Sequence, residues 1–136
     1  MAIVVKVERA DDGLYWGYTD NIPGIVTASG ATLEELKTNM TEAIELTFDT
    51  AEELNKDVYK ELSEGYVLEY ELELSTLFEK IEFLNKTAIA KRFNINPSLF
   101  RNYTNNKEIY MSEERAKRIE KGFHELGKEL MAIKLL

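Results

Sequence analysis

The chain has 136 residues, 44% of them hydrophobic, so it is long enough to bury a core in one domain or in two small ones. It contains no cysteine, which excludes disulfides, thiolate metal sites and cysteine nucleophiles and fits a reducing compartment. No apolar run reaches the roughly 18 residues of a membrane span, and the first residues lack the pattern of a signal peptide. We therefore expect a cytoplasmic protein without a membrane partner.

The net charge of −8 combines two halves of opposite sign. Residues 1–77 carry 17 acidic and 5 basic residues, a net charge of −12. Residues 78–136 carry 8 acidic and 12 basic residues, a net charge of +4. Such asymmetry indicates two modules with different partners, of which the second tolerates phosphate and the first repels it.

The first 30 residues predict three strands. Residues 3–9 place Ile3, Val5 and Val7 on one face at a period of two, and a hairpin turn signal follows. Residues 14–19 form an aromatic-rich second strand. After a Pro-Gly corner, residues 25–29 predict a third strand.

A long amphipathic helix follows the strands. Thr32 and Glu35 have the spacing of a capping box, with Thr32 as the N-cap. Apolar residues then recur every three or four positions, at Leu33, Leu36, Met40, Ala43, Ile44, Phe48 and Ala51. Residues 52–64 are mostly polar, so a break or a second short helix is expected there.

Residues 66–74 alternate in the manner of a strand with one buried face and one acidic face. The apolar side is expected to hold Leu68, Tyr70, Leu72 and Leu74, and the acidic side Glu69, Glu71 and Glu73. The resulting order, β-β-β-α-β, predicts one sheet with the helix on its apolar face. This module is expected to end near Ser75.

The remaining residues predict helices. Thr76 and Glu79 suggest a second capping box, which opens a helix through Leu77, Ile81 and Leu84. Residues 87–93 form the next helix, and the following one begins with Asn96 as cap and Pro97 and stops at residues 105–107. Ser112 opens the last helix, whose apolar seam comprises Ala116, Ile119, Phe123, Leu126, Leu130 and Ile133. Packing of this seam within the chain or on a second copy is equally expected.

Residues 86–103 have the pattern of a helix-turn-helix DNA reader. Ala90 allows two helices to approach closely, Asn94 tolerates the positive φ of a tight turn, and Phe100 and Tyr103 anchor the second helix. Arg and Asn side chains read base edges, and helix ends contact phosphates. The alternative is a plain helical bundle with an exposed polar face. The predicted DNA contacts are Lys86, Thr87, Asn96, Ser98, Leu99, Arg101, Asn102, Asn105 and Lys107.

The sequence offers no constellation for catalysis, and no cofactor is expected. His124 is the single histidine, and the carboxylates lie in runs on predicted solvated helix faces. The aromatic residues near Trp16 are best explained by strand and core packing, with a protein-binding surface as the alternative. As partner contacts we name Tyr15, Trp16, Tyr18, Asp20, Glu69, Glu71 and Glu73.

Three stretches of the first half, residues 13–24 (GLYWGYTDNIPG), 30–36 (GATLEEL) and 39–44 (NMTEAI), resemble the signature of HicB-type antitoxins. Residues 95–99 and 112–115 are similar to the Cro-like DNA reader found in one branch of that family. The resemblance implies a truncated RNase H-like fold without nuclease activity. It also implies a small basic HicA-type mRNA ribonuclease as the bound toxin, and autorepression of the shared operon.

The predicted fold is therefore α+β, with a HicB-like β-β-β-α-β domain over residues 1–75 and an all-α helix-turn-helix domain over residues 76–136. The expected function is that of an antitoxin that binds its toxin and its own operator as a homodimer or higher oligomer, since two readers contact two half-sites. One alternative is an orphan DNA-binding regulator whose acidic domain serves oligomerisation only. Another is a protein-interaction module that never meets DNA.

Overall fold

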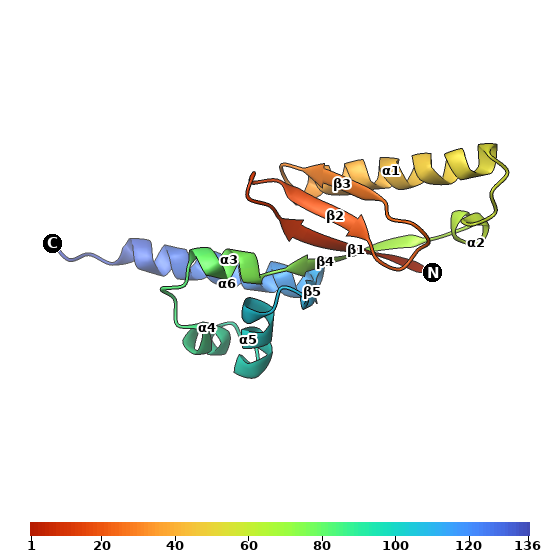
Figure 1. Cartoon of the computed structure of the whole chain (residues 1–136). Helices are drawn as coiled ribbons and strands as arrows, with labels where there is room; N and C mark the ends of the chain where they lie inside the picture. The colour runs from red at the N-terminus through yellow and green to blue at the C-terminus, as the bar shows by residue number, and fades with distance from the viewer. The chain divides into compact units, whose positions relative to one another are not determined.

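A computed structural model describes residues 1–136 and has a mixed α+β architecture with five strands and six helices (Figure 1). The chain divides into two units, Met1–Glu71 (unit 1) and Leu72–Leu136 (unit 2), each with its own core. No helix is both long and apolar enough to cross a membrane.

Unit 1 is built on the strands β1 (Ala2–Arg9), β2 (Tyr15–Thr19), β3 (Thr27–Gly30) and β4 (Val67–Glu73), in the sheet order β3-β2-β1-β4-β5. The β1–β2 and β2–β3 pairs are antiparallel, with Val5 opposite Thr19 and Val7 opposite Gly17. The boundary between the units falls within β4, so its last two residues, Leu72 and Glu73, belong to unit 2.

The third strand starts later than residues 25–29 predicted. The Thr19 side chain accepts a hydrogen bond from the Val26 amide at 2.9 Å, and the Thr19 amide donates to the Val26 carbonyl at 3.0 Å. Val26 is therefore buried in the approach to β3, whereas Ile25 is 73% exposed. The regular pairing with β2 begins only at Thr27.

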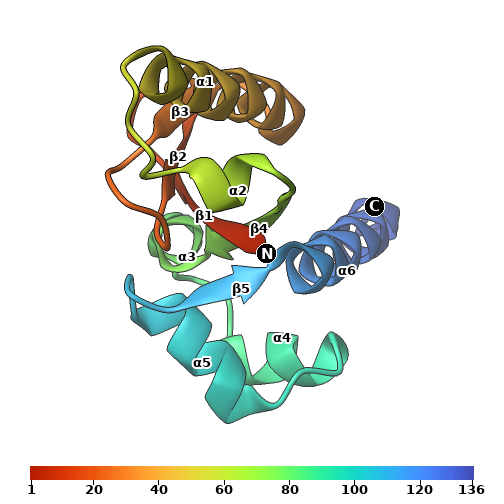
Figure 2. The ribbon, with the colours of Figure 1, turned by 90° about the vertical axis from the view of Figure 1, so that its right-hand side faces the viewer.

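The helix α1 (Leu33–Glu53) lies across one face of the unit 1 sheet (Figure 2). The Thr32 side chain accepts a hydrogen bond from the Glu35 amide at 3.1 Å, which confirms Thr32 as the N-cap. The Glu35 carboxylate accepts from the Ala31 amide instead of the Thr32 amide. The unit 1 core lies between helix and sheet and includes Ile3, Val5, Val7, Leu36, Met40, Ile44 and Phe48.

The expected break after α1 is confirmed. Asn55 has a φ of 55°, and the Lys56 amide donates to the Ala51 carbonyl at 2.8 Å, as in the Schellman motif that ends many helices. The short helix α2 (Lys60–Ser63) follows and buries Leu62.

Unit 2 contains α3 (Ser75–Lys80), α4 (Lys86–Arg92), α5 (Pro97–Asn105), β5 (Tyr110–Ser112) and α6 (Glu113–Ala132). β5 is a short strand that the sequence did not predict, and it follows β4 in the sheet order. The core of the unit is rich in aromatic residues and comprises Phe78, Ile89, Ala90, Phe93, Ile95, Phe100, Tyr103, Met111 and Ile119.

The prediction of Thr76 as a helix cap is wrong. α3 begins at Ser75, two residues before the start expected with Thr76 as the cap, so Thr76 lies inside its first turn. The Thr76 amide donates to the Glu73 carboxylate at 2.9 Å, so the acceptor precedes the helix. α3 also ends at Lys80, before the residues Ile81 and Leu84 that had been expected to continue it.

The seam of α6 divides into two parts. Ile119 is buried in the unit 2 core, and Ala116, Phe123 and Leu126 are partly buried against it. Beyond them, Leu130 is 56% exposed and Ile133 is 60% exposed. The first part of the seam therefore packs within the chain, and the last part does not.

Candidate nucleic-acid interface

The turn between α4 and α5 has a defined geometry because Asn94 adopts a φ of 57°. The Asn94 amide donates to the Lys91 carbonyl at 3.2 Å, and the Ile95 amide donates to the Ala90 carbonyl at 2.9 Å. These are the two hydrogen bonds of a Schellman motif, which satisfies the last carbonyls of a helix and redirects the chain. The positive φ predicted for Asn94 is confirmed.

Both helices of the pair have asparagine caps. Asn96 precedes Pro97, and its side-chain oxygen accepts hydrogen bonds from the Ser98 and Leu99 amides at 2.9 and 3.2 Å, as predicted for a cap. Asn85 caps α4 by accepting from the Ala88 amide at 3.0 Å. The sequence prediction had overlooked Asn85, although the same capping rule finds it.

α5 turns an apolar stripe inward and a polar stripe outward. Phe100, Tyr103 and Thr104 are buried, and the Phe100 ring meets Phe78 and Phe93 edge-on at 5.2 and 6.3 Å between centroids. One face of a helix repeats every three or four residues, so the remaining polar side chains share the opposite face. The exposed residues on this face are Ser98, Arg101, Asn102 and Asn105.

The outward orientation predicted for Leu99 is wrong. Leu99 is only partly exposed and packs against the unit 2 core. It lies one residue before the fully buried Phe100, at the border between the two stripes. Its contribution is therefore to the attachment of α5 to the core.

The candidate cations near the polar face have neighbours within unit 2. Lys86, which is half-buried at the start of α4, donates from Nζ to the Asn105 side chain at 2.5 Å and lies 5.9 Å from the centre of the Phe78 ring. Thr87 is half-buried beside it. These contacts connect the start of α4 with the end of α5. Two of the predicted DNA contacts are thus brought side by side.

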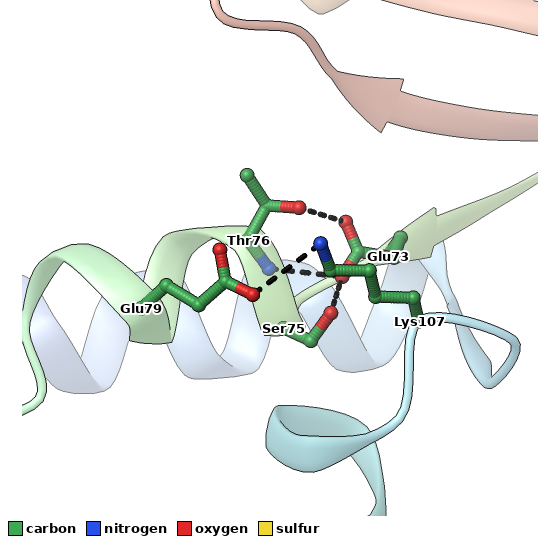
Figure 3. Close-up of polar contacts among 5 residues, drawn as sticks. All are labelled: Glu73, Ser75, Thr76, Glu79 and Lys107. Atoms are coloured by element: carbon green, nitrogen blue, oxygen red, sulfur yellow. Dashed lines mark hydrogen bonds and ion pairs between the residues drawn. The ribbon is translucent and has the colours of Figure 1, made fainter.

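Lys107, at the end of α5, forms an ion pair with Glu79 of α3 at 3.4 Å (Figure 3). Both side chains are more than half exposed, at 67% and 60%. An exposed pair of this kind contributes little to stability, so an incoming phosphate can compete with Glu79 for Lys107 at low cost.

Three further cationic residues lie near the turn and were not among the predicted DNA contacts. They are Arg92, Arg118 and Lys121. A hollow of about 340 Å³ separates the turn from α6 and is lined by Arg92, Phe93, Asn94, Arg118, Lys121, Gly122 and Glu125. Arg92 is paired with Glu129 of α6. The helical spacing of Arg118 and Lys121 is visible in the sequence, but their proximity to Arg92 depends on how α6 packs.

The side chain of Glu73, one of the predicted partner contacts, caps the start of α3. Its two carboxylate oxygens accept hydrogen bonds from the Ser75 hydroxyl and from the amide and hydroxyl of Thr76, the last at 2.8 Å (Figure 3). Glu73 is half-buried and lies in unit 2. It therefore stabilises a helix start and does not extend the acidic surface of unit 1.

Four other predicted partner contacts share the sheet face of unit 1 that is turned away from α1. Trp16 is paired with Glu8 and Tyr18 with Lys6, opposite in orientation to the buried Val5 and Val7. The Lys6 ammonium lies 2.6 Å from the Glu71 carboxylate, which places Glu71, and Glu69 two residues before it, on the same face. Trp16 lies on a strand, as expected, but it is 43% exposed, so the core packing also expected for it is wrong.

The remaining two predicted contacts lie elsewhere in unit 1. Tyr15 faces the α1 side with Arg9, whose guanidinium is 5.1 Å from the ring centre and hydrogen-bonds its hydroxyl at 3.3 Å. Asp20 is exposed just after β2, and its amide donates to the Val4 carbonyl at 3.0 Å.

Comparisons with protein-family models, with curated proteins and with solved structures found no match for this chain.

Proposed function

We propose that this protein is a HicB-like antitoxin and DNA-binding regulator, in which unit 2 reads its own operator and unit 1 binds a small basic HicA-type ribonuclease. The α4–α5 pair is the proposed helix-turn-helix, and the first four strands with α1 form the proposed truncated RNase H-like domain. The protein itself performs no catalysis in this proposal.

The observation that carries the DNA-binding proposal is the polar stripe of α5. Ser98, Arg101, Asn102 and Asn105 project from a helix whose opposite side is fixed by Phe100 and Tyr103 in the core. Arginine pairs with guanine edges and asparagine with adenine edges in the major groove. A recognition helix must present such side chains from a rigid support, and the Schellman turn and the Asn96 cap supply that support.

The charges of the two units support a different binding partner for each unit. Unit 1 contains 16 acidic and 5 basic residues, a net charge of −11, and unit 2 contains 9 acidic and 12 basic residues, a net charge of +3. A basic unit is attracted to phosphate, and an acidic unit to a basic RNA-binding protein. The proposed sheet surface on unit 1 combines Trp16 and Tyr18, which are suitable aromatic anchors for an interface, with Glu69, which attracts a basic partner.

The DNA-binding proposal is tested with the full chain and duplex DNA from the region upstream of its gene. We expect Arg101→Ala and Asn102→Ala each to weaken binding by about 1–3 kcal/mol, or roughly 5- to 150-fold. Lys128→Ala is the matched control, since it removes an exposed charge of unit 2 that lies neither on α5 nor in the hollow beside the α4–α5 turn. Equal binding by the Arg101 and Asn102 variants and the unaltered chain would refute this recognition helix.

The toxin-binding proposal is tested separately. A small basic ribonuclease encoded beside this gene should co-purify with the chain, and Trp16→Ala or Glu69→Lys should weaken the complex without changing operator binding. Operator binding in the absence of any such partner would favour the orphan regulator, whose acidic unit serves oligomerisation only.

A further inference from the structure

The hollow between the α4–α5 turn and α6 gathers cations from two elements of unit 2. Its volume of about 340 Å³ lies in the size range of small-ligand sites. Arg92 comes from the end of α4, and Arg118 and Lys121 lie three residues apart on α6, which places them on one helix face. All three residues are exposed, so their side chains can reach a ligand from solvent.

Two of these cations have no counter-charge in the folded chain. The side chains of Arg118 and Lys121 form no ion pair and no hydrogen bond. Arg92 is paired with Glu129, but the two side chains are 41% and 60% exposed, so this pair is easily exchanged for another anion. A single ion pair also leaves most of the five guanidinium N–H donors of Arg92 unused.

The acidic residues do not cancel the charge of the hollow. Glu125 lines it and forms no ion pair, and Glu129 is the partner of Arg92. Three cations against these two acids leave a net charge of +1. The remaining lining residues, Phe93, Asn94 and Gly122, are uncharged. The hollow therefore attracts anions.

We propose that this hollow binds a phosphate group, held by Arg118 and Lys121 together with Arg92. The planar fork of arginine places two N–H donors on phosphate oxygens, and lysine adds a compact positive charge. A phosphate presents several charged oxygens, so it can meet cations from α4 and α6 at once. Asn94 lines the hollow two residues before the Asn96 cap, so the bound phosphate lies next to the start of α5.

The phosphate can come from a free phosphate ester or from the backbone of DNA bound to unit 2. Only the second source rests on the proposed function. A DNA phosphate here would add a contact that reads no base and therefore raises the affinity for every sequence alike. A free ester would instead make the hollow a small-molecule site beside the proposed recognition helix.

Isothermal titration calorimetry of the full chain with inorganic pyrophosphate, at low salt and without DNA, tests the free source. We expect the double variant Arg118→Ala, Lys121→Ala to bind pyrophosphate at least about 5-fold more weakly than the unaltered chain. The double variant Lys128→Ala, Lys134→Ala is the matched control. It removes the same charge from exposed positions outside the hollow, and it should bind as the unaltered chain does.

A variant that gains affinity excludes misfolding as the cause. Glu125→Gln removes the acid that lines the hollow and should tighten pyrophosphate binding roughly 2- to 5-fold. Glu120→Gln is its control, since Glu120 is exposed on α6 but does not line the hollow. Equal affinities in these two variants would contradict binding in the hollow.

Duplex DNA from upstream of the gene and an unrelated duplex, each measured across salt concentrations, test the second source. A backbone phosphate in the hollow predicts that Arg118→Ala, Lys121→Ala weakens binding to both duplexes alike. It also predicts a slope of log affinity against log salt that is shallower by about 1, with no change in the control. An unchanged slope with pyrophosphate binding that needs Arg118 and Lys121 would assign the hollow to a free ester. An unchanged slope with pyrophosphate binding that is absent, or equal in the two double variants, would overturn the proposal.

These measurements distinguish this inference from the proposed function. Unchanged operator binding by Arg101→Ala and Asn102→Ala, beside a hollow variant that loses pyrophosphate, would refute the recognition helix and leave the phosphate site standing. Weakened operator binding by the two α5 variants, with no effect of the hollow variants on either ligand, would do the reverse.

Discussion

Gly122 of α6 lies directly against the ring of Phe93, the residue that ends α4. A β-carbon at position 122 would stand 2.5 Å from two atoms of the ring. Phe93 is buried and meets Phe123 edge-on at 5.1 Å, so a shift of the ring away from Gly122 would disturb this contact. The absence of a side chain at Gly122 thus sets how closely α6 packs on the α4–α5 turn.

Gly122→Ala should destabilise unit 2. Replacing a helical glycine by alanine normally stabilises a helix by about 1 kcal/mol, but the collision with Phe93 adds an overpacking cost of about 1–3 kcal/mol, so we expect a net loss of up to about 2 kcal/mol. Urea unfolding followed by far-UV circular dichroism measures it. Gly127→Ala is the matched control, since nothing lies within 4 Å of its β-carbon position, and it should stabilise the chain. A stabilised Gly122→Ala variant would contradict the close packing.

Asn94→Gly and Asn94→Ala should differ in stability. The φ of 57° at this position is open to glycine but costs alanine roughly 1 kcal/mol. We therefore expect Asn94→Gly to unfold near the denaturant concentration of the unaltered chain and Asn94→Ala earlier. Equal midpoints for the two variants in urea unfolding would show that the turn is not held in this conformation.

Glu73→Ala should weaken the start of α3. The substitution leaves the Thr76 amide and two hydroxyl groups without their acceptor, at a cost of about 1–3 kcal/mol in the free energy of unfolding. Glu69→Ala, on the same strand but exposed, is expected to change that free energy by less than about 0.5 kcal/mol. The two variants are compared by urea unfolding, and similar losses in both would argue against a capping role for Glu73.

The stability of unit 1 should fall in strongly alkaline solution, in part through Tyr66. Burial, and secondarily the nearby Glu45 carboxylate, raise the pKa of the Tyr66 hydroxyl above its usual 10.0. The folded state therefore holds this proton more tightly than the unfolded state, and its stabilising effect is complete below pH 10.0 and is lost as the pH rises through the raised pKa.

Tyr66→Phe should reduce this alkaline loss, because phenylalanine carries no proton to lose and keeps the edge-on contact with Phe48 at 5.5 Å. Urea unfolding followed by the fluorescence of Trp16, the single tryptophan, reports on unit 1 at each pH. An identical pH dependence in the Tyr66→Phe variant and the unaltered chain would refute the role of Tyr66.

Features governed by neighbouring residues in the chain were predictable from sequence. Thr32 and Asn96 cap helices through hydrogen bonds to amides two or three residues away, and Asn94 forms its turn within five residues of Ala90. The alternation of β1 and the periodicity of α1 likewise follow from local geometry. The proposed DNA and toxin contacts, in contrast, stay predictions, because no residue pattern identifies a ligand by itself.

Features decided by distant neighbours needed the tertiary structure. Trp16 is apolar enough for a core, yet the register with β1 places it on the face that α1 does not cover. The seam of α6 is continuous in sequence, but the core of unit 2 covers it only as far as Leu126. Burial depends on which segments meet in space, and a local pattern does not contain that information.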